Sequence, residues 1–297
     1  MAQINLRGIF PPITTPFIDE NVAYDKLAAN VEKWGKTGIN GFVVLGSNGE
    51  SVYLSEEEKR RVVETVARSA PLGKSVIAGT GCESTRETLR LTKDCAERGA
   101  LAALVITPHF FGGRMDEGAL DRHYRTLADH APIPIILYNV PKFTHLNLSA
   151  NIVSKLADHP NIIGIKDSAG IVNQLGEYLN HVPEDFSVLV GTAGALFGGI
   201  TLGCAGGVLA LANVAPEPCV RIFDLVSEGR FEEAGSLQLR MIPVNKAVTA
   251  TYGIGGLKAA MDMLDYFGGK PRMPLFPSTA AEKAEIRKIL SSAGLLS

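Results

Sequence analysis

Short apolar segments recur along the chain and alternate with longer amphipathic segments. Most of the apolar segments are continuous and rich in Val and Ile, whereas a strand with one solvated face alternates between apolar and polar residues. Continuous apolarity is expected of parallel strands that are covered on both faces. The pattern therefore predicts eight buried parallel strands, at residues 7–14, 41–47, 75–81, 102–108, 134–140, 162–168, 187–193 and 206–213.

The segments between the predicted strands carry helix signals. Ser55 and Glu58, and again Ser84 and Glu87, have the spacing of a capping box, in which a hydroxyl and a carboxylate satisfy free N–H groups at a helix start. Strands that alternate with helices in this way predict an α/β fold, a (β/α)8 TIM barrel. An open doubly wound sheet is the alternative, but no GxGxxG motif follows the first predicted strand.

The barrel is predicted to occupy residues 1–225. Residues 226–297 are predicted to form a C-terminal helical domain that packs on the barrel or on a neighbouring subunit. The uncharged segment from Phe186 to Pro216 is long enough to cross a bilayer, but glycines divide it into short apolar stretches. Two buried strands with a short helix between them are therefore predicted there instead.

The composition permits a large core and narrows the possible partners. With a net charge of −2, 46% hydrophobic and 20% charged residues, the chain is not expected to bind nucleic acid or a membrane surface through bulk charge. The four cysteines form no CxxC pair, and the six histidines show no HxH or HExxH spacing. We therefore expect free thiols, no metal site and, without a secretory signal pattern, a cytoplasmic location.

One lysine interrupts the apolar pattern, in the segment NIIGIKDSAG at residues 161–170. Lysine is among the residues least often buried, so Lys166 either points into water or is held in a pocket for its chemistry. Side chains alternate along a strand, so Lys166 is predicted to share a face with Ile162, Gly164 and Ser168. Asp167 is predicted to face the helix layer, where a tight ion pair with Lys166 is not expected.

Active sites of such barrels lie at the C-terminal ends of the strands. Tyr138 ends the strand before that of Lys166 and shares a face with Ile136. Sequential strands are usually neighbours, so the phenol is predicted to approach the amine. The predicted strand ends carry hydroxyls and amides beside these two groups: Thr14, Thr15, Ser47, Asn48, Thr80, Thr107, Tyr138, Asn139, Lys166, Thr192 and Asn213.

Together these groups favour metal-independent aldol chemistry on a 2-oxo acid. Burial disfavours a charged amine, and a neutral amine can attack a ketone to form a Schiff base that stabilises a neighbouring carbanion. A tyrosine can move the protons, and the Gly-bounded turn GSNGE at residues 46–50 offers N–H groups to a carboxylate. Each group alone also has a structural explanation: a solvated lysine, a packing tyrosine and an ordinary turn.

Five motifs, in this order, resemble the dihydrodipicolinate synthase / N-acetylneuraminate lyase family. They are GSNGE, ITP at 106–108, YNVP at 138–141, GIKDS at 164–168 and GGV at 206–208. The resemblance covers essentially the whole chain, and the stretches GCEST, HPNI and ALANV are most similar to the 4-hydroxy-2-oxoglutarate aldolase branch. It implies a (β/α)8 barrel with a C-terminal helical domain, assembled as a homotetramer, that binds pyruvate covalently and needs no other cofactor.

The resemblance also implies a role for each matching residue. Lys166 matches the lysine that forms the Schiff base with pyruvate, and Tyr138 matches the tyrosine that shuttles protons. Ser47 matches the hydroxyl residue of the proton relay, and the backbone groups of Ser47 and Asn48 match the site of the pyruvate carboxylate. The residues implied to line the pocket are Ser168, Gly191, Thr192 and Leu209.

Two positions depart from the family pattern. Phe110 stands two residues after the proline of the TP pair, where a neighbouring subunit usually lends a relay tyrosine, and a phenyl ring cannot carry a proton. Phe143 stands two residues after Pro141, where dihydrodipicolinate synthases usually have an arginine that contacts a carboxylate.

The leading hypothesis is therefore a class I aldolase that converts 4-hydroxy-2-oxoglutarate to pyruvate and glyoxylate. The alternatives are a 4-hydroxy-tetrahydrodipicolinate (dihydrodipicolinate) synthase and a 2-keto-3-deoxy sugar acid aldolase. A different class also stays open: a non-catalytic member that binds an oxo acid without turnover, because Phe110 replaces the relay tyrosine.

Overall fold

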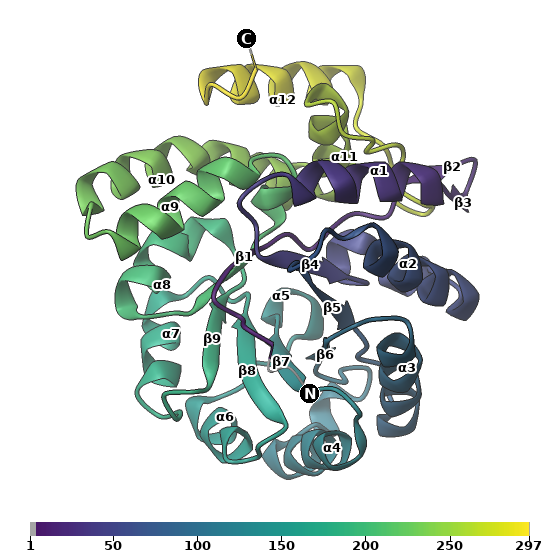
Figure 1. The fold of residues 1–297 in the computed structure, drawn as a ribbon, viewed down its shortest axis with the longest axis vertical. Coiled ribbons are helices and arrows are strands. Elements are labelled where there is room, and N and C mark those ends of the chain that lie inside the picture. Colours follow the sequence, from purple (N-terminus) through teal and green to yellow (C-terminus); the bar gives the residue numbers. More distant parts are fainter. Residues whose placement is uncertain (1–3, 297) are drawn as a thin grey trace.

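The computed structural model describes residues 4–296 and forms a closed barrel of parallel strands surrounded by helices (Figure 1). The eight strands lie side by side in the order β1-β10-β9-β8-β7-β6-β5-β4. Hydrogen bonds between the first and last strands close the barrel: the Ile13 N–H donates to the Val43 carbonyl (2.9 Å), and the Val43 N–H donates to the Pro11 carbonyl (3.0 Å). The predicted (β/α)8 barrel is thus confirmed.

Each barrel strand falls within one of the eight predicted segments and is shorter than predicted. Most of the polar residues at the ends of these segments belong to the loops that follow the strands, whereas Tyr138, Asn139, Lys166 and Asp167 lie within the strands themselves. The strands are β1 (Gly8–Phe10), β4 (Gly41–Val44), β5 (Ser75–Gly79), β6 (Ala102–Ile106), β7 (Ile135–Asn139), β8 (Ile162–Asp167), β9 (Ser187–Val190) and β10 (Gly206–Val208). A separate antiparallel pair, β2 (Phe17–Ile18) and β3 (Asn21–Val22), follows β1.

Helices follow the strands and cover the outside of the barrel (Figure 1). Ser55 and Glu58 form the full predicted capping box, but at Ser84 the prediction was half wrong: Ser84 caps its helix, whereas Glu87 pairs with Arg90 instead. The barrel helices are α1 (Tyr24–Gly35), α2 (Glu56–Ser69), α3 (Thr85–Glu97), α4 (Glu117–His130), the short α5 (Pro141–Thr144), α6 (Ala150–Ala157), α7 (Val172–Leu179), α8 (Leu196–Leu202) and α9 (Pro216–Ser227).

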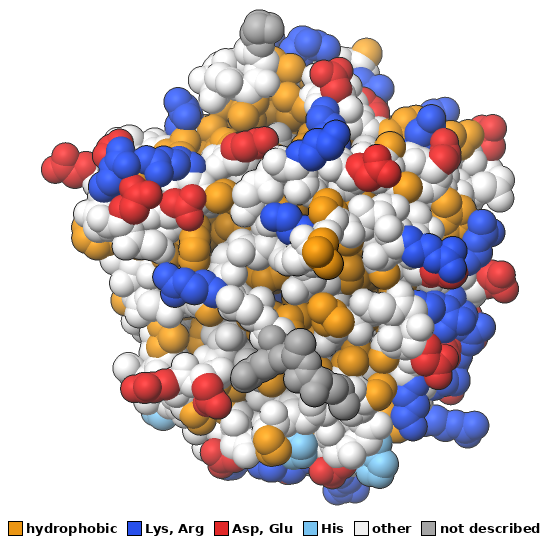
Figure 2. Space-filling view, viewed as in Figure 1, with side chains coloured by type: hydrophobic (Ala, Val, Ile, Leu, Met, Phe, Trp, Pro, Cys, Tyr) orange, Lys and Arg blue, Asp and Glu red, His pale blue; other side chains and the backbone are white. Residues whose placement is uncertain are grey.

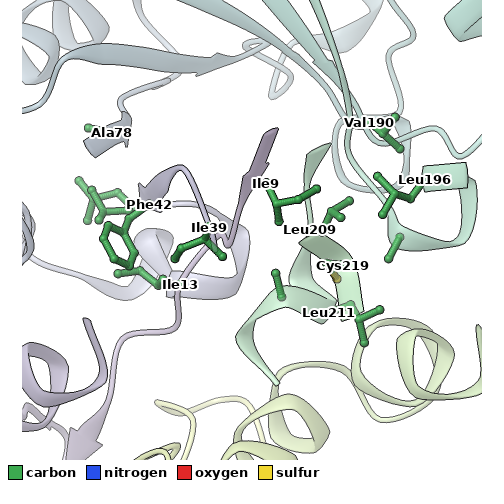
Figure 3. Close-up of a cluster of buried hydrophobic side chains, with 14 of the residues drawn as sticks. Ile9, Ile13, Ile39, Phe42, Ala78, Val190, Leu196, Leu209, Leu211 and Cys219 are labelled. Atoms are coloured by element: carbon green, nitrogen blue, oxygen red, sulfur yellow. The ribbon is translucent and has the colours of Figure 1, made fainter. Parts of the chain in front are cut away.

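The strands separate two hydrophobic cores, which explains why their sequences are apolar on both faces. The inner core fills the barrel with side chains such as Phe10, Ile136 and Leu189. The outer core packs strands against helices, and Figure 3 shows part of it, with Ile9, Phe42 and Leu209 among the labelled side chains. Residues on opposite faces of each strand therefore bury into different cores.

A register shift between β7 and β8 corrects the predicted side-chain alternation. Ile162 pairs with Ile135, but Gly164 pairs with Ile136, so Ile163 is an extra residue on β8. As a result Ile162 belongs to the outer core and Ile163 packs against the inner one, the reverse of the prediction. From Gly164 onward the predicted alternation holds, because the irregularity precedes it.

The uncharged segment from Phe186 to Pro216 forms β9, α8 and β10, as predicted. Within the described residues, no helix combines the length and apolar character needed to span a membrane. On the face shown in Figure 2, Lys and Arg side chains are interspersed with Asp and Glu around the edge, and uncharged side chains predominate toward the centre.

The C-terminal region consists of α10 (Phe231–Lys246), α11 (Gly253–Met263) and α12 (Ala280–Ser292). It packs on the barrel at one side (Figure 1). The Asn30 side chain donates to the Phe267 carbonyl (2.8 Å), and the Lys33 amine donates to the Leu264 carbonyl (3.0 Å). The predicted boundary at residue 225 falls in the last turn of α9, which ends at Ser227.

Candidate active site

Lys166 and Tyr138 lie next to each other on neighbouring strands, as predicted. They are direct register partners at the ends of β8 and β7, and the Lys166 Nζ lies 4.0 Å from the centroid of the Tyr138 ring. Lys166 is only 4% exposed and Tyr138 only 6%. The structure therefore excludes the explanation that Lys166 merely points into water at a strand end.

The surroundings of Tyr138 favour its ionised form. Burial alone would raise the pKa of the phenol, but the nearby Lys166 ammonium and side-chain hydrogen bonding with Ser47, Lys166 and Ser168 outweigh burial, so the pKa is lowered from its usual value. A phenol whose pKa lies closer to neutrality exchanges a proton more readily. Tyr138 is thus a buried phenol with a lowered pKa that lies directly beside a buried amine.

The turn GSNGE brings a set of backbone N–H groups to the same end of the barrel. Ser47 to Gly49 form one tight helical turn after β4, and Glu50 then adopts a left-handed conformation with φ 54°. The N–H groups of Gly49 and Glu50 donate to Gly46 and Ser47 within the turn, at 3.0 and 3.1 Å. The N–H groups of Ser47 and Asn48 have no backbone acceptor among the described residues, so they are available to an anion.

Ser168 and Gly191 are fixed against each other at the ends of β8 and β9. The Ser168 hydroxyl donates to the Gly191 carbonyl at 3.3 Å, and the Gly191 N–H donates to the Asp167 carbonyl at 2.6 Å. A Cβ atom on Gly191 would lie 2.1 Å from the Ser168 hydroxyl oxygen, so only glycine fits there. Thr192 follows and is half-buried.

Leu209 does not join this group through its side chain. It is completely buried and belongs to the outer core, where it is drawn with Ile9 and Leu211 (Figure 3). Its side chain therefore packs between strands and helices, and only its backbone can face a ligand at the barrel end.

Asp167 faces the helix layer, as the strand alternation predicted. Its Oδ2 accepts hydrogen bonds from Asn139 and Gln174, both at 2.7 Å, and its Oδ1 accepts from the Ala169 N–H at 3.0 Å. Burial raises the pKa of this carboxyl, and the hydrogen bonds from Asn139, Ala169 and Gln174 oppose that rise. The network ties the end of β8 to β7 and to α7 directly behind Lys166.

The comparisons with known proteins agree with this arrangement. Residues 5–293 match the dihydrodipicolinate synthetase family. The chain belongs to this family.

The similarity to members of the dihydrodipicolinate synthetase family covers nearly the full length. The chain is 37% identical to a 4-hydroxy-tetrahydrodipicolinate synthase of Methanothrix thermoacetophila, over 96% of both chains. It is 33% identical to one of Phenylobacterium zucineum, over 100% of both. It also superposes with a TM-score of 0.93 and 30% identity on the pyruvate complex of the Acinetobacter baumannii dihydrodipicolinate synthase, covering 98% of this chain and 100% of that one. The protein is therefore a lyase of the class I aldolase type.

Several strand-end residues that were predicted to face the barrel mouth have structural roles instead. The Thr80 hydroxyl pairs with that of Thr92 at 2.8 Å, in the layer between β5 and α3. Asn213 donates to the Pro12 carbonyl at 3.1 Å and is fully buried. Asn139, expected at the mouth, binds Asp167 on the helix side. Neither Gln174 nor Tyr178, which complete that network, was predicted, because both lie on a helix whose sequence gives no sign of a polar cluster.

The two departures from the family pattern are both solvent-exposed. Phe110 is 76% exposed, and its ring packs edge-on against Phe111, with centroids 5.0 Å apart. Glu83 holds the backbone of this loop by accepting from the N–H groups of His109 and Phe110 at 2.9 and 2.8 Å. Phe143 is 50% exposed. Both side chains are phenyl rings, so neither position supplies a polar group to the site described above.

Proposed function

We propose that this lyase binds pyruvate as a Schiff base on Lys166 and joins it to, or releases it from, an aldehyde. One observation carries the proposal: a lysine that is almost fully buried lies 4.0 Å from the ring of a tyrosine, at the catalytic end of the barrel. Among the described residues Lys166 has no carboxylate partner, and the group that interacts with its amine is Tyr138.

The proposed chemistry begins when the neutral amine of Lys166 attacks the ketone carbon of pyruvate. Tyr138 relays the protons that allow water to leave, which gives a protonated imine. The imine draws electrons from the neighbouring methyl carbon, which loses a proton and becomes an enamine. The enamine carbon then attacks the aldehyde carbonyl, and hydrolysis of the imine restores Lys166. The imine itself is the electron sink, so the proposal needs no metal or further cofactor.

The remaining predicted site residues fit the binding of the 2-oxo acid. In this proposal the free N–H groups of Ser47 and Asn48 bind the pyruvate carboxylate, and the Ser47 hydroxyl passes protons to and from Tyr138. The side of the proposed pyruvate site opposite the GSNGE turn is formed by Ser168, Gly191 and Thr192. The hydrogen bond from Ser168 to Gly191 holds their loops together.

For the second substrate, the similarity to the curated relatives favours 4-hydroxy-tetrahydrodipicolinate synthase activity. Relatives that are 33–37% identical over nearly their whole length carry that name. Removing the carbons of pyruvate from the product leaves an amino acid that ends in an aldehyde, aspartate 4-semialdehyde. We therefore infer that this aldehyde is the first to test as the partner of pyruvate.

A second candidate, cleavage of 4-hydroxy-2-oxoglutarate to pyruvate and glyoxylate, is favoured by one observation. The resemblance places an arginine of the synthases at the position of Phe143, which here is a half-exposed phenyl ring. The loss of a guanidinium removes a paired contact to the carboxylate of an amino-acid aldehyde. The cleavage uses the same enamine in the reverse direction, so the Lys166 chemistry is common to both candidates.

Trapping with borohydride tests the shared step. The protein is incubated with pyruvate and borohydride, its intact mass is measured and the modified peptide is mapped, with Lys166→Ala as the control. We expect one adduct, on the peptide that contains Lys166, and none in the control. An unmodified Lys166 would refute the aldolase proposal.

Turnover assays then separate the candidates. Aspartate 4-semialdehyde with pyruvate tests the synthase, and release of glyoxylate from 4-hydroxy-2-oxoglutarate tests the cleavage. An adduct without turnover of either substrate, or of 2-keto-3-deoxy sugar acids, would favour the non-catalytic oxo-acid-binding alternative. We also expect a homotetramer, which sedimentation measures directly.

A further inference from the structure

The C-terminal region contains a second buried lysine, far from Lys166 in the sequence. Lys258 lies in α11 and its side chain is completely buried. Its Nζ lies 2.5 Å from Oε1 of Glu50 and donates to the carbonyl groups of Thr15 and Lys270, at 2.8 and 3.1 Å. The ammonium also lies 4.4 Å from the centroid of the Phe17 ring. The charge therefore has four partners from the same chain: Glu50, Thr15, Lys270 and Phe17.

The carboxylate that Lys258 holds belongs to the last residue of the turn GSNGE. Glu50 is 2% exposed and has the left-handed backbone conformation, φ 54°, that a residue with a side chain seldom adopts. Its N–H donates to the Ser47 carbonyl at 3.1 Å, so the conformation of Glu50 is coupled directly to the peptide units that precede it. Those peptide units include the free N–H groups of Ser47 and Asn48.

The C-terminal region holds Glu50 from a second direction. The backbone N–H of Arg272 donates to Oε2 of Glu50 at 2.8 Å. The Arg272 guanidinium donates to the Tyr53 carbonyl at 2.7 Å and to both carboxylate oxygens of Glu58, at 2.9 and 2.7 Å. Arg272 of the C-terminal region thus fastens the turn at Glu50 and the segment that follows it at Tyr53 and Glu58.

The cost of a buried ion pair indicates what it does here. Removing two charges from water costs several kcal/mol per ion. In proteins generally, two well-packed apolar side chains of the same size stabilise the fold at least as well as a buried ion pair does. A buried pair does, however, fix one geometry, because each charge accepts few alternative positions. In this chain the geometry that it fixes is a strained turn at the catalytic end of the barrel.

We propose that Lys258 is a positioning residue for substrate binding. Through Glu50 it holds the turn so that the N–H groups of Ser47 and Asn48 point together at the carboxylate of the 2-oxo acid. The inference rests on the proposed function, because it assigns that carboxylate to the turn. It gives the C-terminal helices a role in the active site although none of their residues forms part of the candidate site.

The test measures the pyruvate concentration that gives half-maximal borohydride trapping on Lys166, and separately KM and kcat. Lys258→Met removes the charge and keeps the length of the side chain. We expect it to raise the half-saturating pyruvate concentration, and KM, by on the order of 10- to 100-fold, as a displaced binding group does. The kcat at saturating pyruvate should change much less, because Lys166 and Tyr138 are untouched.

Lys33→Met is the matched control. Lys33 also connects the barrel to the C-terminal region through a carbonyl, that of Leu264, and it has no contact with the turn. We expect the pyruvate concentration that gives half-maximal trapping in Lys33→Met to stay within about twofold of that of the parent protein, because substitutions away from a site usually have small effects. An equal increase in Lys33→Met would show that general loosening of the C-terminal region, and not Lys258, is responsible, and would overturn the proposal.

Glu50→Gln provides an independent second variant, since it removes the partner charge and keeps the side-chain size. It should raise the half-saturating concentration in the same direction as Lys258→Met. Unchanged pyruvate binding in both variants would overturn the proposal, and so would the absence of folded protein for both by circular dichroism, because the pair would then serve the fold alone. If the parent protein forms no adduct at all, it is the proposed function that fails.

Discussion

The two buried lysines of this chain have opposite surroundings. Lys258 is saturated, with a carboxylate, two carbonyl groups and an aromatic ring around its ammonium. Lys166 is almost as deeply buried, yet its close neighbour is a tyrosine, and no described carboxylate pairs with it. The acceptors around Lys258 stabilise its charge. The proposed function requires Lys166 to lose its charge before it reacts, and no described carboxylate lies beside it to oppose that loss.

The largest effect is expected from exchanging the reactive lysine. Lys166→Met should reduce aldolase turnover to the background of the assay, because the proposed imine forms on the amine that this substitution removes. Turnover of aspartate 4-semialdehyde with pyruvate, or of 4-hydroxy-2-oxoglutarate, measures it. Lys258→Met, assayed at saturating pyruvate, serves as the comparison and should retain most of its kcat. Substantial turnover by Lys166→Met would assign the chemistry to another residue.

Tyr138→Phe should lower kcat by about 10²- to 10⁴-fold, the usual contribution of a positioned acid and base. The ring remains beside Lys166, so the imine should still be trapped by borohydride, although more slowly. Single-turnover trapping and steady-state rates measure the two effects separately. A kcat within a few fold of the parent value would mean that protons move through another group, and His109 would be the first to examine.

The lowered pKa of Tyr138 predicts that this phenol ionises before the other tyrosines as the pH rises. Phenolate absorbance during a pH titration should show one early transition that Tyr138→Phe removes and Lys166→Ala shifts upward, because the ammonium favours the phenolate. Since the pKa is lower in the folded than in the unfolded protein, where it is about 10, this group stabilises the fold increasingly as pH rises between the two values. Identical titrations of the parent and Tyr138→Phe would contradict this.

Exchange of Lys166 should have the larger effect on turnover, whereas exchange of Lys258 should have the larger effect on the free energy of unfolding. Lys258→Met leaves the Glu50 carboxylate buried without its partner, which should lower the free energy of unfolding by roughly 3–5 kcal/mol. Lys166→Met removes a buried charge that has no carboxylate partner, so the protein should be as stable as the parent or more so. Denaturant unfolding of both variants measures the difference. Equal losses in the two would mean that the contrast in their surroundings has no energetic consequence.

The smallest effect on kcat is expected from a substitution of Asp167, which lies on the helix side of β8 behind Lys166. Asp167→Asn keeps the shape of the side chain and can still accept from Asn139 or Gln174, so kcat should fall by less than about tenfold. Thermal unfolding checks that the variant is folded. A loss as large as that of Tyr138→Phe would show that the Asp167 charge acts on Lys166 directly and does more than fix the end of β8.

The sequence predicted the barrel and the proximity of Lys166 and Tyr138 well because both depend on local patterns. Continuous apolarity located the strands, and the period of two along β8 placed Lys166 and Asp167 on opposite faces, as the structure shows. The extra residue Ile163 was not predicted, because a bulge depends on the register with β7 and leaves no mark in the pattern. Asn139 was predicted at the barrel mouth, but it lies on the helix side because it binds Asp167, and this tertiary contact also leaves no mark in the sequence pattern.

Lys258 could not have been predicted from sequence alone. A lysine in an amphipathic helix is ordinarily on the solvated face, and GLKAAMDM gives no reason to expect otherwise. Its partners Thr15 and Glu50 lie more than two hundred residues away along the chain, as the separation of 243 between Lys258 and Thr15 shows. Only the packing of α11 against the barrel brings the three together.

The most direct test of the account is the location of the pyruvate adduct. Pyruvate and borohydride are added to the parent protein, to Lys166→Ala and to Lys258→Met, and the intact masses and modified peptides are compared. The account predicts a gain of one pyruvate less one water plus two hydrogens, on Lys166 alone, in the parent and in Lys258→Met, and no gain in Lys166→Ala. An adduct that persists in Lys166→Ala, or no adduct in the parent protein, would contradict it.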